Sequence, residues 1–161
     1  MLPSSTGSAK RLRVRGPPMI NIRRILYATD FSSYSNQAYF HAVALAAHHR
    51  ASLTITFVYS PGTAAGAQPS SPETDRDYWK NQLEQIRPVD PSIDVHHVML
   101  TGDPASEIVN YAKAQNINLI VMGTHGRSGL ERILMGSVAE KVMREAPCSV
   151  LVVKIPKGPI V

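Results

Sequence analysis

Residues 118–137 read NLIVMGTHGRSGLERILMGS, a short apolar run that leads into a segment rich in glycine. A run such as Leu119–Met122, apolar at every position, is typical of a strand buried on both faces of a parallel sheet. Glycine permits positive φ and lets a ligand come close to the backbone. Gly123 and Gly126 are therefore expected to let the loop turn sharply where this strand ends.

The rest of the chain alternates between strand-like and helix-like patterns. Apolar or β-branched runs predict four more strands, at residues 25–28, 52–60, 94–100 and 149–154. Helical spacing and N-terminal capping signals predict helices over residues 34–49, from Pro72, from Pro104 and over 137–146. Trp79, Leu83 and Ile86 are expected to form the buried stripe of the second helix. This order favours an α/β fold with a doubly wound, five-stranded parallel sheet and helices on both faces.

Composition indicates one globular domain and a basic N-terminal extension. Of the 161 residues, 43% are hydrophobic and 18% are charged, an ordinary balance for a globular protein. The net charge of +5 comes from residues 1–24, which hold six Lys and Arg and no acid. We expect residues 1–20 to be a disordered extension and residues 21–157 to be the domain. One cysteine and no apolar run near the ~20 residues of a membrane span favour a cytoplasmic protein without membrane contact.

Two strand exits carry unusual chemistry, Ala28-Thr29-Asp30 and the segment that begins at Gly123. In doubly wound sheets ligands bind at the carboxyl ends of the strands, where the winding direction switches. Gly136 and Ser137 begin a predicted helix, and helix N-termini bind phosphate. An alternative stays open, in which the glycines only form a turn and Ser137 and Glu140 form a capping box. The spacing is G-x2-G-x9-G-S and matches neither G-x-G-x-x-G nor a P-loop.

The glycine spacing, with a helix and a final apolar strand after it, resembles the ATP-binding signature of the universal stress protein family. The stretch ILYATDFS, residues 25–32, is similar to that family's first strand and its aspartate. The resemblance covers about residues 22–155. It implies the strand order 3-2-1-4-5, binding of ATP, ADP or AMP with Mg²⁺, a switch or sensor in the stress response, and a homodimer through the last strand.

The resemblance also implies which residues bind the nucleotide. Asp30 lies at the adenosine end with Ala28 and Thr29, and the backbone of Val58 meets adenine. Met122 and Gly123 line the base and ribose, whereas His125, Gly126 and Arg127 follow the ribose and phosphates. The phosphate cradle is formed by Gly136, Ser137 and Val138.

Alternatives from other functional classes have less support in the residues. A slow ATPase, or another nucleotide-using enzyme, would need His125 as a base, and no orienting carboxylate is apparent near it in sequence. We therefore expect no catalytic residue. Nucleic-acid binding would rest on the basic extension alone, because the body carries no basic stripe interleaved with aromatic residues. The pairs His48-His49 and His96-His97 do not predict a metal site, since neighbours on a strand point to opposite faces and histidine suits a helix end.

Overall fold

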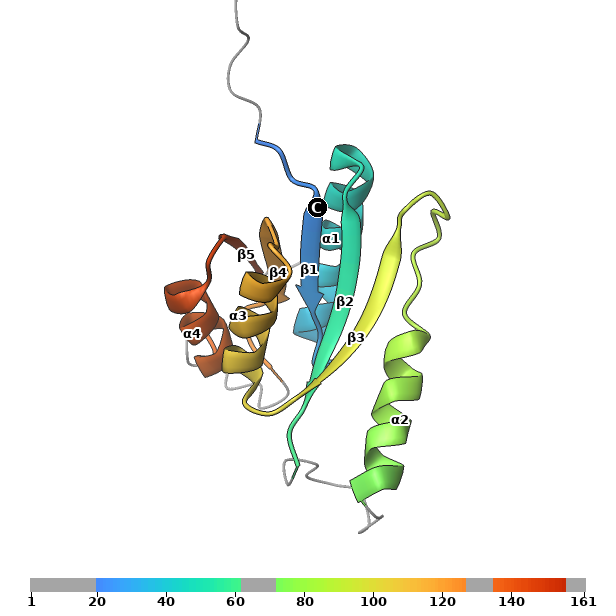
Figure 1. Cartoon of the computed structure of the whole chain (residues 1–161), viewed down its shortest axis with the longest axis vertical. Coiled ribbons are helices and arrows are strands. Elements are labelled where there is room, and N and C mark those ends of the chain that lie inside the picture. Colours follow the sequence, from blue (N-terminus) through green and yellow to red (C-terminus); the bar gives the residue numbers. More distant parts are fainter. Residues whose placement is uncertain (1–19, 62–71, 127–134, 156–161) are drawn as a thin grey trace, which may run out of the picture.

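The computed structural model describes residues 20–61, 72–126 and 135–155, in which strands and helices alternate (Figure 1). The strands are β1 (Arg24–Ala28), β2 (Ser52–Tyr59), β3 (Val95–Thr101), β4 (Leu119–Gly123) and β5 (Ser149–Val153). The helices are α1 (Ser33–His49), α2 (Pro72–Glu84), α3 (Pro104–Ala114) and α4 (Ser137–Glu145). The predicted elements are all present, with boundaries that differ by a few residues.

The strands form one sheet in the order β3-β2-β1-β4-β5, and every neighbouring pair is parallel. In register, Tyr27 of β1 lies between Ile55 of β2 and Val121 of β4. From β1 the chain adds β2 and β3 on one side and then returns to place β4 on the other. The predicted fold class and strand order are therefore confirmed. The winding direction reverses between β1 and β4, where such folds bind ligands.

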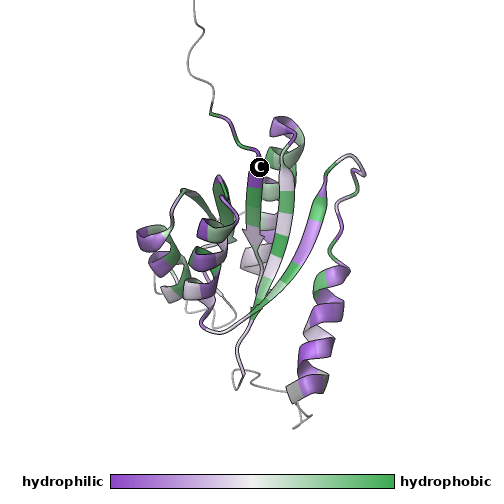
Figure 2. Ribbon diagram, viewed as in Figure 1, coloured by the Kyte–Doolittle hydropathy of each residue, from purple (hydrophilic) through white to green (hydrophobic). Residues whose placement is uncertain are grey.

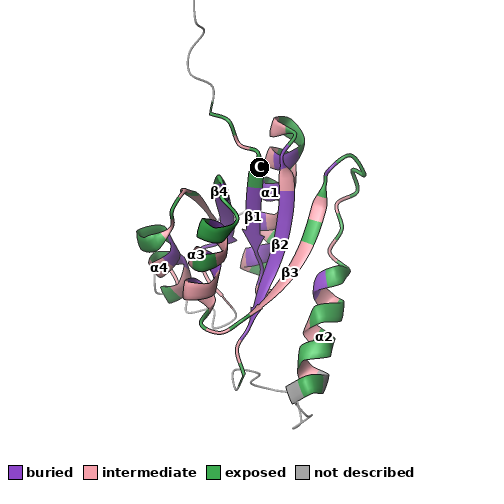
Figure 3. Ribbon diagram, viewed as in Figure 1, coloured by how far each residue is buried: buried purple, intermediate pink, exposed green. Residues whose placement is uncertain are grey.

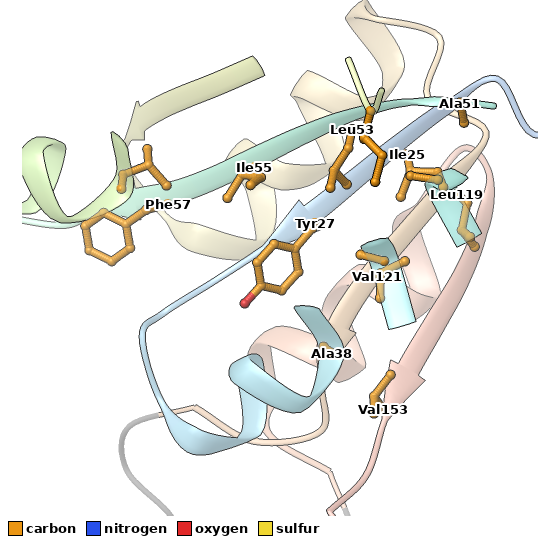
Figure 4. Close-up of a cluster of buried hydrophobic side chains, with 14 of the residues drawn as sticks. Ile25, Tyr27, Ala38, Ala51, Leu53, Ile55, Phe57, Leu119, Val121 and Val153 are labelled. Carbon is orange, nitrogen blue, oxygen red and sulfur yellow. The ribbon is translucent and has the colours of Figure 1, made fainter. Parts of the chain in front are cut away.

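Helices cover both faces of the sheet, so the central strands are buried on both sides. Ile25 and Tyr27 of β1 join a cluster with α1 and α2, whereas Leu26 and Ala28 join a second cluster with α3 and α4. Figure 4 shows the first cluster, in which Tyr27 and Val121 lie near Ala38 of α1. Burial of a large apolar side chain stabilises the fold by about 1.5–3 kcal/mol. Two such clusters explain why β1 and β4 are apolar at almost every position.

Burial decreases from the centre of the sheet toward its edges. Strand β4 and nearly all of β1 and β2 are buried, whereas β3 and β5 are mostly half-exposed (Figure 3). Apolar residues concentrate in β1 and β2, and polar ones cover most of α2 (Figure 2). Leu83 of α2 is buried as predicted, but Trp79 is only half-buried, because it lies where α2 meets the end of the sheet. Trp79 is therefore not a simple core residue.

Capping side chains explain where two of the helices begin. Ser32 caps α1 by accepting a hydrogen bond from the backbone N–H of Ser35. Asp103 caps α3 by accepting one from the N–H of Ser106. Helix α4 begins differently, with Gly136 at the N-cap and no side-chain hydrogen bond to its first turn. The alternative of a capping box with Ser137 as the N-cap is therefore wrong, because Ser137 is already the first helical residue.

Candidate nucleotide site

A pocket of about 370 Å³ lies at the carboxyl ends of the central strands. Its walls come from the ends of β1, β2 and β4 and from the starts of α3 and α4. The structure brings together these residues named from the sequence: Ala28, Thr29, Asp30, Val58, Met122, Gly123, His125, Gly126, Gly136, Ser137 and Val138. Arg127, also named from the sequence, lies outside the described residues.

Gly123 is required by the protein's own backbone. A β-carbon at this position would lie 2.7 Å from the carbonyl carbon of Tyr34 and 2.8 Å from its carbonyl oxygen. Gly102 is the one glycine in the described part of the chain with positive φ, so Gly123 and Gly126 do not have the conformation expected of them. Their role is close approach: the first turn of α1 packs directly on the end of β4. This contact sets the distance between the two strand exits.

Asp30 is held by the start of α1 and faces the glycine-rich loop. Its Oδ1 accepts hydrogen bonds from the N–H of Ser32 at 3.0 Å and from the Ser32 hydroxyl at 2.6 Å. Its Oδ2 lies 2.9 Å from where a β-carbon on Gly126 would be. One oxygen therefore anchors the carboxylate, while the other packs against the loop that follows β4.

Buried hydroxyls hold the turn between β1 and α1. Thr29 and Ser35 form a hydroxyl–hydroxyl bond of 3.2 Å, and the Tyr27 hydroxyl donates to the Ser35 carbonyl at 2.8 Å. Burial raises the pKa of Tyr27 to about 12, so its hydroxyl remains protonated at neutral pH. In the described part of the chain, no buried side-chain nitrogen or oxygen lacks a hydrogen-bond partner. The turn that presents Asp30 is therefore a satisfied polar network.

The next residue, Phe31, has a left-handed backbone conformation with φ 62°. A bulky residue rarely adopts positive φ unless its surroundings hold it there. The backbone N–H of Phe31 donates to the Thr29 hydroxyl at 3.0 Å. Its ring lies against Phe57 and Trp79, with centroids 5.0 Å and 5.3 Å away. The strained turn thus directs Asp30 toward the pocket and Phe31 into an aromatic cluster.

The N-terminus of α4 forms another part of the pocket wall. The backbone N–H of Gly136 donates to the carbonyl of Thr124 at 2.7 Å, which joins the start of the helix to the exit of β4. By their positions in the first turn, the N–H groups of Ser137, Val138 and Ala139 have no intrahelical acceptor. All three residues line the pocket, and Gly136 at the N-cap has no side chain to cap them. The positive end of the helix dipole is therefore available to an anion.

His125 follows the end of β4 and also lines the pocket. Its Nδ1 is 3.0 Å from the Thr124 hydroxyl, and its ring lies 5.1 Å from the ring of Tyr34. The imidazole therefore has a hydroxyl and an aromatic ring beside it. These contacts suit a residue that lines the loop.

The start of α3 carries a separate charged network beside the pocket. Lys141 of α4 donates to Asp103 Oδ2 at 3.0 Å and to the Ser106 hydroxyl at 2.8 Å. Hydrogen bonds from Ser106 and Lys141 lower the pKa of Asp103 to about 2. This network ties α3 to α4, and residues of both helices line the pocket.

Several lining residues were not predicted from the sequence. They are Ser35, Thr56, Phe57, Tyr59, Ser60, Trp79, Pro104, Ile108, Thr124 and Ala139. Most of them are adjacent in sequence to a predicted site residue or lie on the same face of the same strand. That proximity could have been used to predict them from the sequence. Trp79 has no such signal, because its helix reaches the pocket only through tertiary packing.

The described residues contain neither a cluster of metal ligands nor a membrane-spanning helix. Residues 20–61, 72–126 and 135–155 contain no group of three or more His, Cys, Asp or Glu side chains placed to hold a metal ion. Over the same ranges no helix has the length and apolar character that crossing a membrane requires.

Comparison with known proteins places the chain among relatives of the same fold. Residues 21–154 match the model of the universal stress protein family. Universal stress protein MJ0531 of Methanocaldococcus jannaschii is 39% identical over 142 residues, which cover 84% of each chain.

Solved structures agree with this result. The structure of MJ0577, also from M. jannaschii, has a TM-score of 0.69 and 28% identity and covers 86% of this chain and 100% of its own. A universal stress protein solved in complex with cAMP has a TM-score of 0.64 and 24% identity, over 83% of this chain and 97% of its own. The family match extends over nearly the whole described chain and includes every part of the pocket, and the chain belongs to the universal stress protein family.

Proposed function

We propose that this protein binds an adenine nucleotide in the pocket at the carboxyl ends of β1 and β4 and uses it as a switch or sensor in the stress response. One observation carries the proposal: the uncapped N-terminus of α4 and the anchored carboxylate of Asp30 lie in the same pocket. An anion site and a hydrogen-bond acceptor in one pocket suit the phosphates and the adenosine of a nucleotide.

The pocket fits such a ligand in size and in chemistry. Its volume of about 370 Å³ falls in the usual range for small-molecule sites, roughly 300–1,000 Å³. Apolar side chains from Ala28, Val58, Met122 and Ile108 offer a surface for a planar base. The N–H groups of Ser137 and Val138 would hold phosphate oxygens. The glycine-rich segment, whose residues 127–134 are not described, would supply Arg127.

Mg²⁺ would accompany the phosphates. It is held in many nucleotide sites by phosphate oxygens and water with only one or two carboxylates, and it offsets phosphate charge. Asp30, the one carboxylate among the described residues that line the pocket, is assigned to the adenosine and not to the metal. A site of this kind needs no cluster of protein ligands, so the proposed metal depends on the nucleotide.

We propose binding without efficient hydrolysis. Fast phosphoryl transfer needs charge stabilisation at the γ-phosphate and a group that orients the attacking water. Asp30 is bound by Ser32 and packs against Gly126, and His125 contacts a threonine hydroxyl and a tyrosine ring. A bound nucleotide would therefore bias a conformation, as a ligand of a switch does.

The proposed organisation is a cytoplasmic homodimer of one domain, residues 21–157, with residues 1–20 as an extension. Strand β5 is an edge of the sheet, and pairing it with its symmetry mate would satisfy its outward backbone groups. The free edge and the neutral body of the chain support this arrangement. The proposed arrangement does not include binding of nucleic acid.

Native mass spectrometry of the protein as purified, followed by calorimetry with ATP, ADP, AMP and cAMP in the presence and absence of Mg²⁺, tests the proposal. We expect ATP binding that Mg²⁺ strengthens. The cAMP arm is included because a protein of this fold was solved with cAMP. If none of the four nucleotides is retained or bound, the proposed function is wrong.

A further inference from the structure

An aromatic cluster forms the wall of the pocket beside β2. Trp79 of α2 lines the pocket together with Phe57 of β2. The Trp79 ring stacks on Phe31 with centroids 5.3 Å apart and planes at 24°, and it lies 5.4 Å from Phe57 at 36°. Phe31 and Phe57 are themselves 5.0 Å apart. Each ring is thus fixed by the other two, and part of the indole surface faces the pocket.

The cluster lies at the end of the pocket away from α4. Strand β1 has β4 on one side and β2 on the other, and α4 follows β4. The pocket therefore extends from the first turn of α4, across the ends of β4 and β1, to β2 and Trp79. A nucleotide with its phosphates on α4 would direct its base toward β2.

We propose that Trp79 contacts the base of the bound nucleotide and favours ligands that carry a planar aromatic group at this end. The proposal rests on the proposed nucleotide site. Bases interact favourably with aromatic side chains because both present flat, polarisable surfaces. The cluster is also organised before binding, since Phe31 is held at φ 62° by the turn that presents Asp30. A pre-ordered wall loses little side-chain entropy when the ligand arrives.

The chain provides its own reporter for this contact. Trp79 is the one tryptophan among the 161 residues, so tryptophan emission of the full-length protein reports on this position alone. The wild-type protein would be titrated with ATP, with adenosine and with tripolyphosphate, while calorimetry records saturation by each. We expect ATP and adenosine to change the emission and tripolyphosphate, which has charge but no base, to leave it unchanged.

Substitutions at Trp79 separate a base contact from a structural role. Trp79→Ala should weaken binding of ATP and adenosine by about tenfold, the scale of a base–aromatic contact, and leave tripolyphosphate affinity unchanged. Trp79→Phe keeps an aromatic surface and should bind with intermediate affinity. Lys80→Ala, at an exposed neighbour on α2 that does not line the pocket, is the matched control and should behave as the wild type.

Several outcomes would overturn the proposal. If the emission is unchanged at an ATP concentration that calorimetry shows to be saturating, Trp79 does not contact the base. Nucleotide binding itself would still stand. Equal loss of ATP and tripolyphosphate affinity in Trp79→Ala would assign the residue a purely structural role. Should that variant fail to fold, as judged by circular dichroism, the wild-type emission decides alone. Absence of any nucleotide binding in the wild type would overturn both this inference and the proposed function.

Discussion

The carboxylate of Asp30 occupies the space that a side chain at Gly126 would need. Oδ2 of Asp30 lies 2.9 Å from the position of a β-carbon on Gly126, and Oδ1 is bound by Ser32. The two residues are far apart in sequence but meet because β1 and β4 are neighbours in the sheet. Position 126 therefore favours glycine because Asp30, at the exit of the other strand, occupies the space that a side chain would need.

The two glycines at this edge should differ in their sensitivity to alanine. At Gly126 the new methyl group would meet the end of one side chain, so Asp30 can move, and we expect a loss of about 1 kcal/mol of unfolding free energy. At Gly123 it would meet the backbone of Tyr34 and Ser35, which cannot move independently, and roughly 3 kcal/mol or more should be lost. Urea denaturation of both variants measures the difference.

A double-mutant cycle identifies the cause. In an Asp30→Ala background Gly126→Ala should lose most of its effect, whereas Gly123→Ala should keep its own. Equal effects of the two glycine substitutions, or no coupling of Gly126 to Asp30, would contradict the packing described here.

Ser137→Asp should have opposite effects on stability and binding. A carboxylate in the first turn of α4 interacts favourably with the helix dipole, so unfolding free energy should rise by about 0.3–1 kcal/mol or stay level. The same charge would repel phosphate, and ATP affinity should fall at least about tenfold, or 1.4 kcal/mol. Ser137→Asn, of similar shape and no charge, is the control. Calorimetry and thermal melts on both variants check this, and undiminished ATP affinity in Ser137→Asp would exclude the helix end as the anion site.

Acid should weaken the protein partly through Asp103. Its pKa in the folded state is about 2, below the ordinary value of 3.8 for this side chain, because Ser106 and Lys141 stabilise the carboxylate. A depressed pKa contributes stability above the unfolded value and loses it as pH falls through the folded value. We therefore expect the contribution to be complete above about pH 5 and to disappear between about pH 4 and pH 2.

Asp103→Asn isolates this effect, since asparagine is an equally good N-cap without the charge. Melting temperatures of the variant and the wild type, recorded from neutral pH to about pH 2, should converge on acidification. A constant difference between the two proteins over the whole range would contradict the role assigned to the Asp103 charge.

Val152→Pro should dissociate the proposed dimer without breaking the sheet. The carbonyl of Val153 accepts from the N–H of Thr124, so alternate residues of β5 bond to β4 and the N–H of Val152 points to the open edge. Proline would remove that outward donor. Analytical ultracentrifugation should show a dimer for the wild type and for Val152→Ala, and a monomer for Val152→Pro. A monomeric wild type would refute the dimer.

Turnover of ATP should be far below the ordinary enzyme range of about 1 s⁻¹ and above. Among the described residues, His125 is the one candidate base near the phosphate end of the pocket. Phosphate release at saturating ATP and Mg²⁺ would be compared between the wild type and His125→Ala. Fast release that depends on His125 would make the protein an enzyme and contradict the switch.

Local patterns in the sequence were enough to determine the class of the fold and the edge of the sheet where the pocket lies. The apolar run at Leu119–Met122 and the capping signals at Ser32 and Asp103 depend on residues close together in the chain, and the structure has the expected strand and helices there. The G-x2-G-x9-G-S spacing likewise identified the exit of β4, and the described residues named from it line one pocket.

Only the tertiary structure shows why particular residue types stand at the pocket. Gly123 and Gly126 are glycines because of Tyr34 and Asp30, and not because of their own backbone angles. Helix α4 begins one residue earlier than a serine cap would allow, since the N–H of Gly136 is held by Thr124. Trp79 reaches the pocket through α2 packing on Phe57. In each case the partner is distant in sequence, and such contacts exist only once strand order and helix packing have brought the two segments together.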